Sequence, residues 1–349
     1  FGDLLGVFRS GLGDELGAVA FKVPPGENVY AECTNDWASS LVAPAPLDDV
    51  LSQLHPAAVG MPADGIATPI RSGLLRGRNL FINGDPARRR VLLMMTDGFQ
   101  TTPNCSISDG AAFRASEIEP YGFELLSIGF GGGSVNSALL SDMSDFYEVA
   151  DGSVSLAKAF ADMLAVVLNQ DIVLDPQGYL AAGGSQTFTL PLSSQVESAT
   201  FLLNWGRASE SLELTVRAPD GTLVTSSTTA PGLESLAGST YQARVFRFPL
   251  GGALAGNLSG TWEITASRPF GGGLEPFNLM VLGDTPLEFD PVVSSQRVRT
   301  TEVLSLLARL EGAFEASVSA EVRRPAPSLP CSSSFATCPS DASFCARPA

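Results

Sequence analysis

The chain has 349 residues, enough for two or three domains with a substantial core. Its formal net charge of −16 and the absence of a basic stripe argue against nucleic acid as a partner, because phosphate binding requires clustered Lys and Arg. We expect no signal peptide within these residues, and no apolar run approaches the roughly 18 residues that predict a membrane span. We interpret the start at Phe1 as a sign of processing or truncation.

The first elements are short and separated by glycine and proline. Apolar residues at positions 1, 4, 5 and 8 predict a helix over 1–8. A strand is expected over 18–22, with a hairpin partner around 28–32, and a helix over 46–54. The single histidine, His55, follows that helix. No nucleophile motif accompanies it, so we interpret it as a surface or helix-end residue.

The most informative stretch begins at residue 91. Residues 91–95 are all apolar and are followed by Thr96, Asp97 and Gly98. Such a run predicts a strand buried on both faces of a parallel sheet. Ligands of open α/β sheets bind outside the carboxyl ends of the strands, so Asp97 is a candidate site residue. The alternative is that Asp97 and Gly98 only form a turn.

Strands and helices alternate around this run. A helical pattern follows Pro69 through Leu80, and another is expected over 111–118. Strands are predicted over 123–130 and 146–150, and a long apolar-faced helix over 154–168. This alternation predicts an α/β fold with a parallel sheet.

Taken in order, these pieces resemble the von Willebrand factor A domain, over residues 1–169. The resemblance rests on the segment Gly65 to Thr68 and on the apolar run that ends in Thr-Asp-Gly. It implies a doubly wound, Rossmann-like domain with a divalent-cation site of the MIDAS type. Within that site Thr68 and Asp97 would be ligands of Mg²⁺, or of Ca²⁺ or Mn²⁺. Hard cations of this kind prefer oxygen ligands.

The chain departs from this family at one important place. The family holds its first metal ligands in an Asp-x-Ser-x-Ser loop after a central first strand, which would lie before Phe1. No such motif occurs in the 349 residues. Two interpretations stay open: the A-like domain is N-terminally incomplete, or its site has lost three of the five usual ligands.

Beyond Asp171 the apolar period changes from helical to alternating. About seven short strands are expected over 170–283, which predicts a β-sandwich. The turn at residues 219–221, Pro-Asp-Gly, predicts a hairpin. Trp205 and Trp262 alternate with aliphatic residues, so we expect them in the core. The alternative is that they form platforms for carbohydrate.

Residues 284–349 are expected to form a partial immunoglobulin-like module with a cysteine-containing tail. Alternating residues over 304–310 and 318–322 predict two strands. The chain has five cysteines, of which Cys33 and Cys105 lie in the A-like domain. The tail cysteines match no zinc pattern and favour a disulfide staple in an exported protein. Those in the tail are Cys331, Cys338 and Cys345.

These features predict an extracellular or cell-surface module for adhesion or protein binding. Its partner would be a protein that presents an acidic group to the cation. A structural assembly subunit that contacts neighbouring copies without metal is the alternative. A third reading is an accessory part of a larger secreted metallopeptidase. Neither a His-Glu-x-x-His motif nor a nucleophile elbow occurs, so we expect no enzyme activity in this chain.

Overall fold

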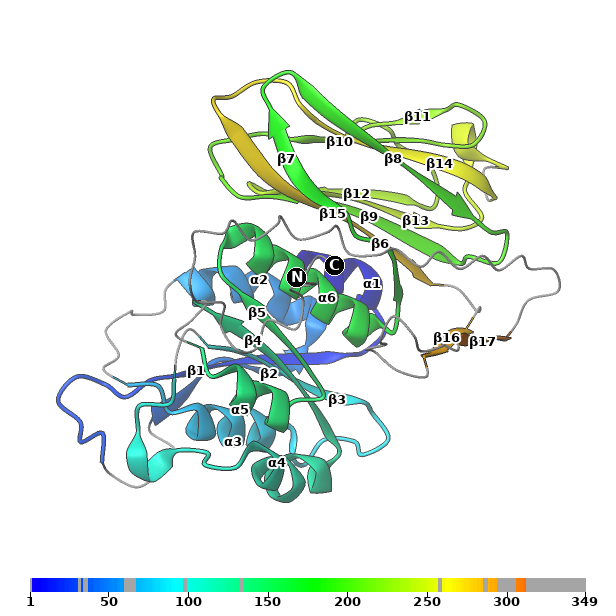
Figure 1. Cartoon of the computed structure of the whole chain (residues 1–349). Helices are drawn as coiled ribbons and strands as arrows, with labels where there is room; N and C mark the ends of the chain where they lie inside the picture. The colour runs from blue at the N-terminus through cyan, green and yellow to red at the C-terminus, as the bar shows by residue number, and fades with distance from the viewer. Residues whose placement is uncertain are drawn as a thin grey trace, which may run out of the picture. The chain divides into compact units, whose positions relative to one another are not determined.

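A computed structural model describes residues 2–30, 33, 37–59, 67–96, 99–131, 135–256, 259–284, 288–293 and 306–311. The chain divides into two compact units, Phe1–Pro286 and Leu287–Ala349. Within the first unit, residues 2–168 mix helices and strands and are called the α/β part. Residues 171–284 are β-rich and are called the sandwich part (Figure 1). The mixed and β-rich regions expected from the sequence are therefore both present.

Most predicted elements of the α/β part are confirmed, and one helix, α5, escaped prediction. The helix expected over 111–118 is a short α-helix, α4, that continues as a π-helical turn, Arg114–Ile118. In chain order the elements are α1 (Gly2–Arg9), β1 (Glu15–Phe21), β2 (Ala38–Pro46), α2 (Leu47–Val59), α3 (Ile70–Phe81), β3 (Arg90–Thr96), α4 (Gly110–Phe113), β4 (Phe123–Phe130), α5 (Ser137–Met143), β5 (Phe146–Ala150) and α6 (Ser153–Leu168).

The antiparallel partner of β1 is β2, so the hairpin partner expected around 28–32 is wrong. The residues between the strands include Pro24, Pro25 and Gly26, and Pro cannot donate to a strand ladder. They instead form a long connection that is tied down through Cys33. The alternating pattern of residues 28–32 predicted the wrong partner, because the disulfide that holds this connection cannot be recognised from the local sequence.

A parallel sheet is formed by β3, β4 and β5 in that order, with β4 in the centre. The apolar run at 91–95 predicts a strand buried on both faces, but in the part of the chain that the structure describes β3 pairs only with β4 and is at the sheet edge. Its exposure agrees, because Met94 is buried whereas Met95 is 46% exposed. A strand with one hydrogen-bonded neighbour cannot be covered as fully as β4.

Helices cover both faces of these strands (Figure 1). On one face, α3 and α5 pack in a core with β3 and β4. On the other face, α6 packs against Leu126 and Ile128 of β4. Helix α3 also joins the two sheets, because its Gly73 faces Phe21 of β1 and its Gly77 faces Leu92 of β3. A methyl group added at Gly73 would lie 2.4 Å from the Phe21 ring, so this approach requires glycine.

Two antiparallel sheets form the sandwich part (Figure 1). One has the order β11-β10-β14-β8. The other has the order β12-β13-β9-β15-β6, with β7 also pairing with β15. The strands are β6 (Asp171–Leu174), β7 (Gln177–Ala181), β8 (Gly184–Leu192), β9 (Ser198–Trp205), β10 (Glu213–Arg217), β11 (Leu223–Val224), β12 (Leu233–Ala237), β13 (Tyr241–Arg247), β14 (Gly260–Arg268) and β15 (Leu274–Asp284).

Side chains of both sheets fill the sandwich core. The predicted hairpin at 219–221 is confirmed, since it joins β10 to β11 and Gly221 has a φ of 91°. Trp205 and Trp262 are 3% and 0% exposed, as expected for core residues. The carbohydrate-platform alternative is therefore wrong, because neither indole presents a face to solvent. Trp262 instead contacts Phe246, with ring centroids 5.2 Å apart.

The sheet that contains β9 has an outer face that carries a second core, which it shares with the α/β part. All eight residues of β9 are buried, so both faces of that strand are covered. Leu202 of β9 belongs to one hydrophobic cluster with Leu164 of α6 and Leu4 of α1. Two hydrogen bonds reinforce this seam: Tyr241 donates to Asp3, and Arg247 donates to the Val7 carbonyl.

In the second unit, β16 (Glu288–Val293) pairs antiparallel with β17 (Leu306–Glu311). The strand expected over 304–310 overlaps β17 and is confirmed. The strand expected over 318–322 and the three tail cysteines lie outside the described residues. The divisions at 169 and 283 stay predictions for independent domains.

Candidate functional site

Strands β1 and β3 end at the same rim of the α/β part, and the sequence predicts the candidate site at this rim. Just after β1, the Val23 amide donates to the Ala67 carbonyl, at 3.1 Å. The next residue, Thr68, donates its own amide to Oγ1 of Thr101, at 2.8 Å. Thr101 lies in the loop that follows β3. Ala67 and Thr68 therefore lie between the ends of the two strands.

The predicted pair of metal ligands is described only in part. Thr68 lies at the rim beside the loop after β3. Asp97 lies outside the described residues, although its neighbour Thr96 is 4% exposed at the end of β3. The assignment of Thr68 and Asp97 as ligands to one cation stays a prediction.

A disulfide between Cys33 and Cys105 fastens the loops of this rim. The bond joins the long connection after β1 to the loop after β3. A small hydrophobic cluster surrounds it, in which Val23, Trp37 and Cys105 are at most 3% exposed and Ala67 packs alongside. The sequence did not predict this pairing. The available signal was that exactly two of the cysteines fall inside the A-like region.

Buried hydroxyl groups complete the contacts around the disulfide. Ser72, in the first turn of α3, places Oγ 3.3 Å from Sγ of Cys105. Thr102 is fully buried, and its carbonyl accepts a hydrogen bond from the Cys105 amide at 3.0 Å. These contacts fix the start of α3, and with it the segment that carries Thr68, against the loop after β3.

The described part of this rim does not by itself make a metal site. Thr68 and Thr101 supply hydroxyl oxygens, but a hard divalent cation also requires carboxylates. Among the described residues, no group of three or more His, Cys, Asp or Glu side chains is arranged to hold a metal ion. Any cation here would depend on Asp97 and on further oxygen ligands.

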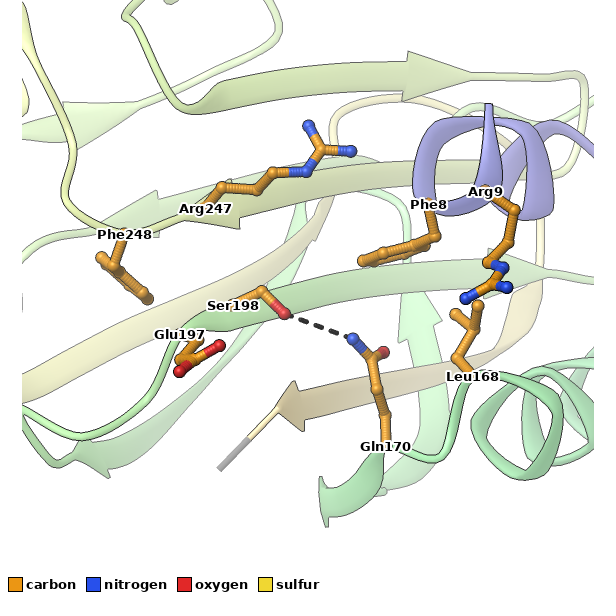
Figure 2. Close-up of a pocket in the computed structure, with 8 residues that line it drawn as sticks. All are labelled: Phe8, Arg9, Leu168, Gln170, Glu197, Ser198, Arg247 and Phe248. Atoms are coloured by element: carbon orange, nitrogen blue, oxygen red, sulfur yellow. Dashed lines mark hydrogen bonds between the residues drawn. The ribbon is translucent and has the colours of Figure 1, made fainter. Parts of the chain in front are cut away.

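A second concave feature lies where α1, the end of α6, β9 and β13 meet (Figure 2). This cleft has a volume of about 510 Å³. At its floor, Gln170 donates to the Ser198 hydroxyl at 3.3 Å, which leaves Gln170 Oε1 buried without a partner among the described residues. Phe8 contributes an aromatic ring, over which the Arg247 guanidinium lies 5.9 Å from the centroid.

The two arginines of this cleft already have partners. Arg247 donates to Glu234 at 3.2 Å and to the Val7 carbonyl. Arg9 donates to Asp14, and this hydrogen bond raises the pKa of Arg9 above its ordinary value. The guanidinium groups are therefore used to hold the seam between the α/β part and the sandwich part, and we assign the cleft no ligand.

One lysine at the same seam is shared by two carboxylates. Lys158 of α6 lies 2.8 Å from Asp162 of the same helix and 2.8 Å from Asp175, which follows β6. Asn278 of β15 donates to Asp175 at 2.7 Å. Burial raises the pKa of Glu148 on β5, and the negative charge of Asp162 raises it further. Burial likewise raises the pKa of Asp162, against the opposing effect of Lys158.

These shifts predict a stability that depends on pH through Glu148. A carboxyl whose folded pKa lies above its unfolded value near 4.5 favours folding in acid, and that contribution is lost as pH rises through the folded pKa. Glu148→Gln should therefore raise the melting temperature at pH 7 relative to the parent, with little difference near pH 4. Calorimetry across this range measures it. A variant that is destabilised equally at every pH would contradict the assignment.

Compared with protein-family models and with curated proteins, the chain shows no match. Among solved structures it is similar to proximal thread matrix protein 1 from the mussel byssus, with 17% identity over 52% of this chain and 42% of that one, at a TM-score of 0.35. A pilus adhesin, SpaC from Lactobacillus rhamnosus GG, matches with 11% identity over 87% of this chain and 46% of that one, also at a TM-score of 0.35.

A lipase from Bacillus licheniformis, BlEst2 in its propeptide form, is also similar, with 13% identity over 50% of this chain and 44% of that one, at a TM-score of 0.24. The chain spans less than half the length of each of these three proteins. With TM-scores of 0.35 or below, these likenesses assign neither a fold family nor a function. Within the described residues, no helix is both long and apolar enough to cross a membrane.

Proposed function

We propose that this chain is an extracellular or cell-surface protein-binding module, built on a von Willebrand factor A-like domain whose rim holds a divalent cation. The observation that carries the proposal is the position of Thr68 beside the loop after β3, at the end of a parallel strand. A ligand with an acidic group would complete the coordination of a cation held there, because such cations accept carboxylate oxygen.

The arrangement of strands and helices supports the A-like part of this proposal. A parallel sheet with helices on both faces is the arrangement of doubly wound folds. The antiparallel pair β1 and β2 precedes that sheet in the chain, and α3 packs on both β1 and β3. The A-like family has one further strand, its first and central one.

The Cys33–Cys105 disulfide supports an extracellular location. Disulfides persist in oxidising compartments and are rare in the cytosol. This bond also connects the loops of the proposed site, so its formation and the geometry of the rim depend on the same environment. A secreted protein would keep both the disulfide and the geometry of the rim.

Hydrogen exchange tests whether the sheet has open strand edges. Within the described chain, β3 pairs only with β4, so half of its amides point away from any partner strand. We expect those amides to exchange much faster than the amides of β4, whose two neighbours are β3 and β5. Equal protection of β3 and β4 in the 349-residue chain would show that another segment already occupies this edge.

Metal binding tests the rim directly. Mn²⁺ replaces Mg²⁺ at oxygen sites and is visible by electron paramagnetic resonance, so it serves as the probe. We expect Asp97→Asn and Thr68→Ala each to weaken Mn²⁺ binding, whereas Glu213→Gln, an exposed change on β10, should leave it unchanged. Binding that survives both rim substitutions would reject the cation site but leave a cation-independent binding role untouched.

A second candidate is a structural subunit of an extracellular assembly that binds no metal. Among the described residues β1 pairs only with β2 and β3 only with β4, which favours this candidate, because an unpaired strand edge accepts an extended strand from another chain. The two candidates differ in a measurable way. An assembly subunit would gain protection of its β3 amides on association in the presence of a chelator, whereas the cation-dependent module would not.

We propose binding rather than catalysis for either candidate. The one histidine, His55, falls within α2. At the rim, the Thr101 hydroxyl contacts a backbone amide and the Ser72 hydroxyl contacts Cys105 Sγ, and neither partner is a general base. An accessory role within a larger secreted metallopeptidase would place the catalytic groups on another domain. Activity found in the isolated chain would overturn this part of the proposal.

A further inference from the structure

One edge of the four-stranded sheet of the sandwich part is only partly covered by a neighbouring strand. β10 pairs with β14 along its whole length, but on its other side β11 pairs only with Val216 and Arg217. The backbone nearer the start of β10 therefore has no partner strand at this edge in the described chain. This stretch contains Leu212 and Leu214, which are 0% and 1% exposed. Buried backbone groups of this kind need another partner.

A glutamine from the opposite sheet supplies that partner. Gln242 lies on β13, and its Oε1 accepts a hydrogen bond from the Leu214 amide at 3.1 Å (Figure 1). Its Nε2 donates to the Leu212 carbonyl at 3.0 Å. One side-chain amide thus accepts from one residue and donates to the residue two positions earlier. The backbone of a neighbouring strand offers the same donor and acceptor, so Gln242 takes the place of a strand.

An arginine on the same strand completes the contact. Arg244 donates from Nη2 to the Leu214 carbonyl at 3.4 Å and to Gln242 Oε1 at 3.2 Å. Its Nη1 donates to the carbonyl of the adjacent Ala243 at 2.8 Å. Together the two side chains occupy the Leu212 carbonyl and both polar backbone groups of Leu214. The start of β10 is therefore closed by side chains where β11 no longer reaches.

The burial of Arg244 is unusual for a charged side chain. Arg244 is 1% exposed, and its acceptors are carbonyl and amide oxygens rather than a carboxylate. Burial lowers the pKa of Arg244 below its ordinary value. An apolar residue of similar volume often serves a protein core as well as a buried charge or better. The arginine has a role that an apolar side chain could not take, which is to satisfy the Leu214 carbonyl.

The segment behind this contact is suited to pairing with another strand. Residues 212–216 are Leu-Glu-Leu-Thr-Val, an alternating sequence with three strand-favouring apolar or β-branched positions facing the core. An unpaired edge of such a strand accepts an extended strand from another molecule. At the other edge of this sheet, β8 contains Pro191, which has no amide hydrogen to offer a partner. Residues 212–217 contain no proline, so closure of this edge depends on the side chains from β13.

We propose that Gln242 and Arg244 form an edge cap, a closed contact that prevents β10 from pairing with a strand of a second copy of this chain. Without the cap, the Leu212 carbonyl and the Leu214 amide become available to a partner strand. In an assembly subunit, the cap would restrict strand pairing to the α/β part. The proposal uses residues of the sandwich part only, so it does not depend on the cation site or on either function proposed above.

Amide exchange at Leu214, followed by NMR in the 349-residue chain, tests whether the cap holds the edge closed. We expect Gln242→Ala to speed this exchange about tenfold relative to Leu203 of β9, because the amide loses its acceptor. The comparison with Leu203 separates local opening from a general loss of stability. Gln242→Glu is the matched variant: its carboxylate still accepts from Leu214, so exchange there should stay slow. An unchanged rate in Gln242→Ala, or equal acceleration in both variants, would overturn the proposal.

Sedimentation velocity tests the consequence for association. The double variant Gln242→Ala, Arg244→Met should at least double the weight-average mass of the parent as concentration rises. Gln186→Ala is the control and should match the parent, since Gln186 is a strand glutamine on β8 that donates to the Tyr179 carbonyl at 3.4 Å. Circular dichroism checks that each variant is folded, and Gln242→Ala alone replaces the double variant if the latter is not.

Two results of the sedimentation experiment would reject the edge cap. A variant whose Leu214 amide exchanges rapidly but whose mass equals that of the parent would show that the contact only joins the two sheets. Association of Gln186→Ala to the same extent would show that loss of any strand glutamine causes it. Association confined to variants with a rapidly exchanging Leu214 amide is the result that supports the proposal.

Discussion

Leu164→Ala is expected to lower the free energy of unfolding of the first unit by about 2–5 kcal/mol, the usual cost of deleting a fully buried leucine. Leu164 is 0% exposed on α6 and belongs to the cluster that joins the α/β part to the sandwich part. Chemical denaturation measures the change. Trp37 reports on the α/β part, and Trp205 and Trp262 report on the sandwich part, so fluorescence follows both.

The two parts should lose structure together, since they share the core around Leu164. We therefore expect far-UV circular dichroism and tryptophan fluorescence to give the same midpoint in the parent chain. Leu223→Ala, at an exposed position, is the control and should cost far less. Two separate transitions in the parent, with only one shifted by Leu164→Ala, would show that the shared core does not couple the parts.

Removing the disulfide is the second change with a large expected effect. The bond between Cys33 and Cys105 closes a loop with a sequence separation of 72 residues. In the chain-entropy account, a loop of that length contributes about 4 kcal/mol by restricting the unfolded chain. The double variant Cys33→Ser, Cys105→Ser should therefore unfold at markedly lower denaturant concentration, measured under non-reducing conditions.

A reductant provides the control for this prediction. Reduction should destabilise the parent chain by a similar amount but should not affect the double variant further. Any additional loss in the double variant would come from cysteines elsewhere in the chain. A double variant as stable as the parent would mean that the small core around Trp37 and Val23 holds the rim loops without the covalent bond.

The position of α6 connects these predictions with the proposed function. One face of α6 packs on Leu126 and Ile128 of β4, and its other face packs on Leu202 of β9. The chain enters β6 at Asp171, three residues after α6 ends at Leu168. Any movement of this helix would alter both cores, so the sandwich part is mechanically linked to the strands that carry the rim.

Periodicity predicted most of the individual elements. The apolar run at 91–95, the helix at 154–168 and the strands that contain Trp205 and Trp262 are all present, because each has a strong pattern over its own length. Helix α5 was missed because its seven residues are too few to establish a helical period. The hairpin partner of β1 was misplaced because the intervening loop depends on a distant cysteine.

The sequence by itself determined the two fold classes and the identity of the residues available at the strand end. Tertiary structure alone decided that β3 has β4 as its one neighbour in the described chain, that Cys33 pairs with Cys105, and that α6 is buried between two cores. The reason is physical: a periodic pattern reports which side of an element is apolar, whereas strand order, disulfide pairing and helix burial depend on segments far away in the chain.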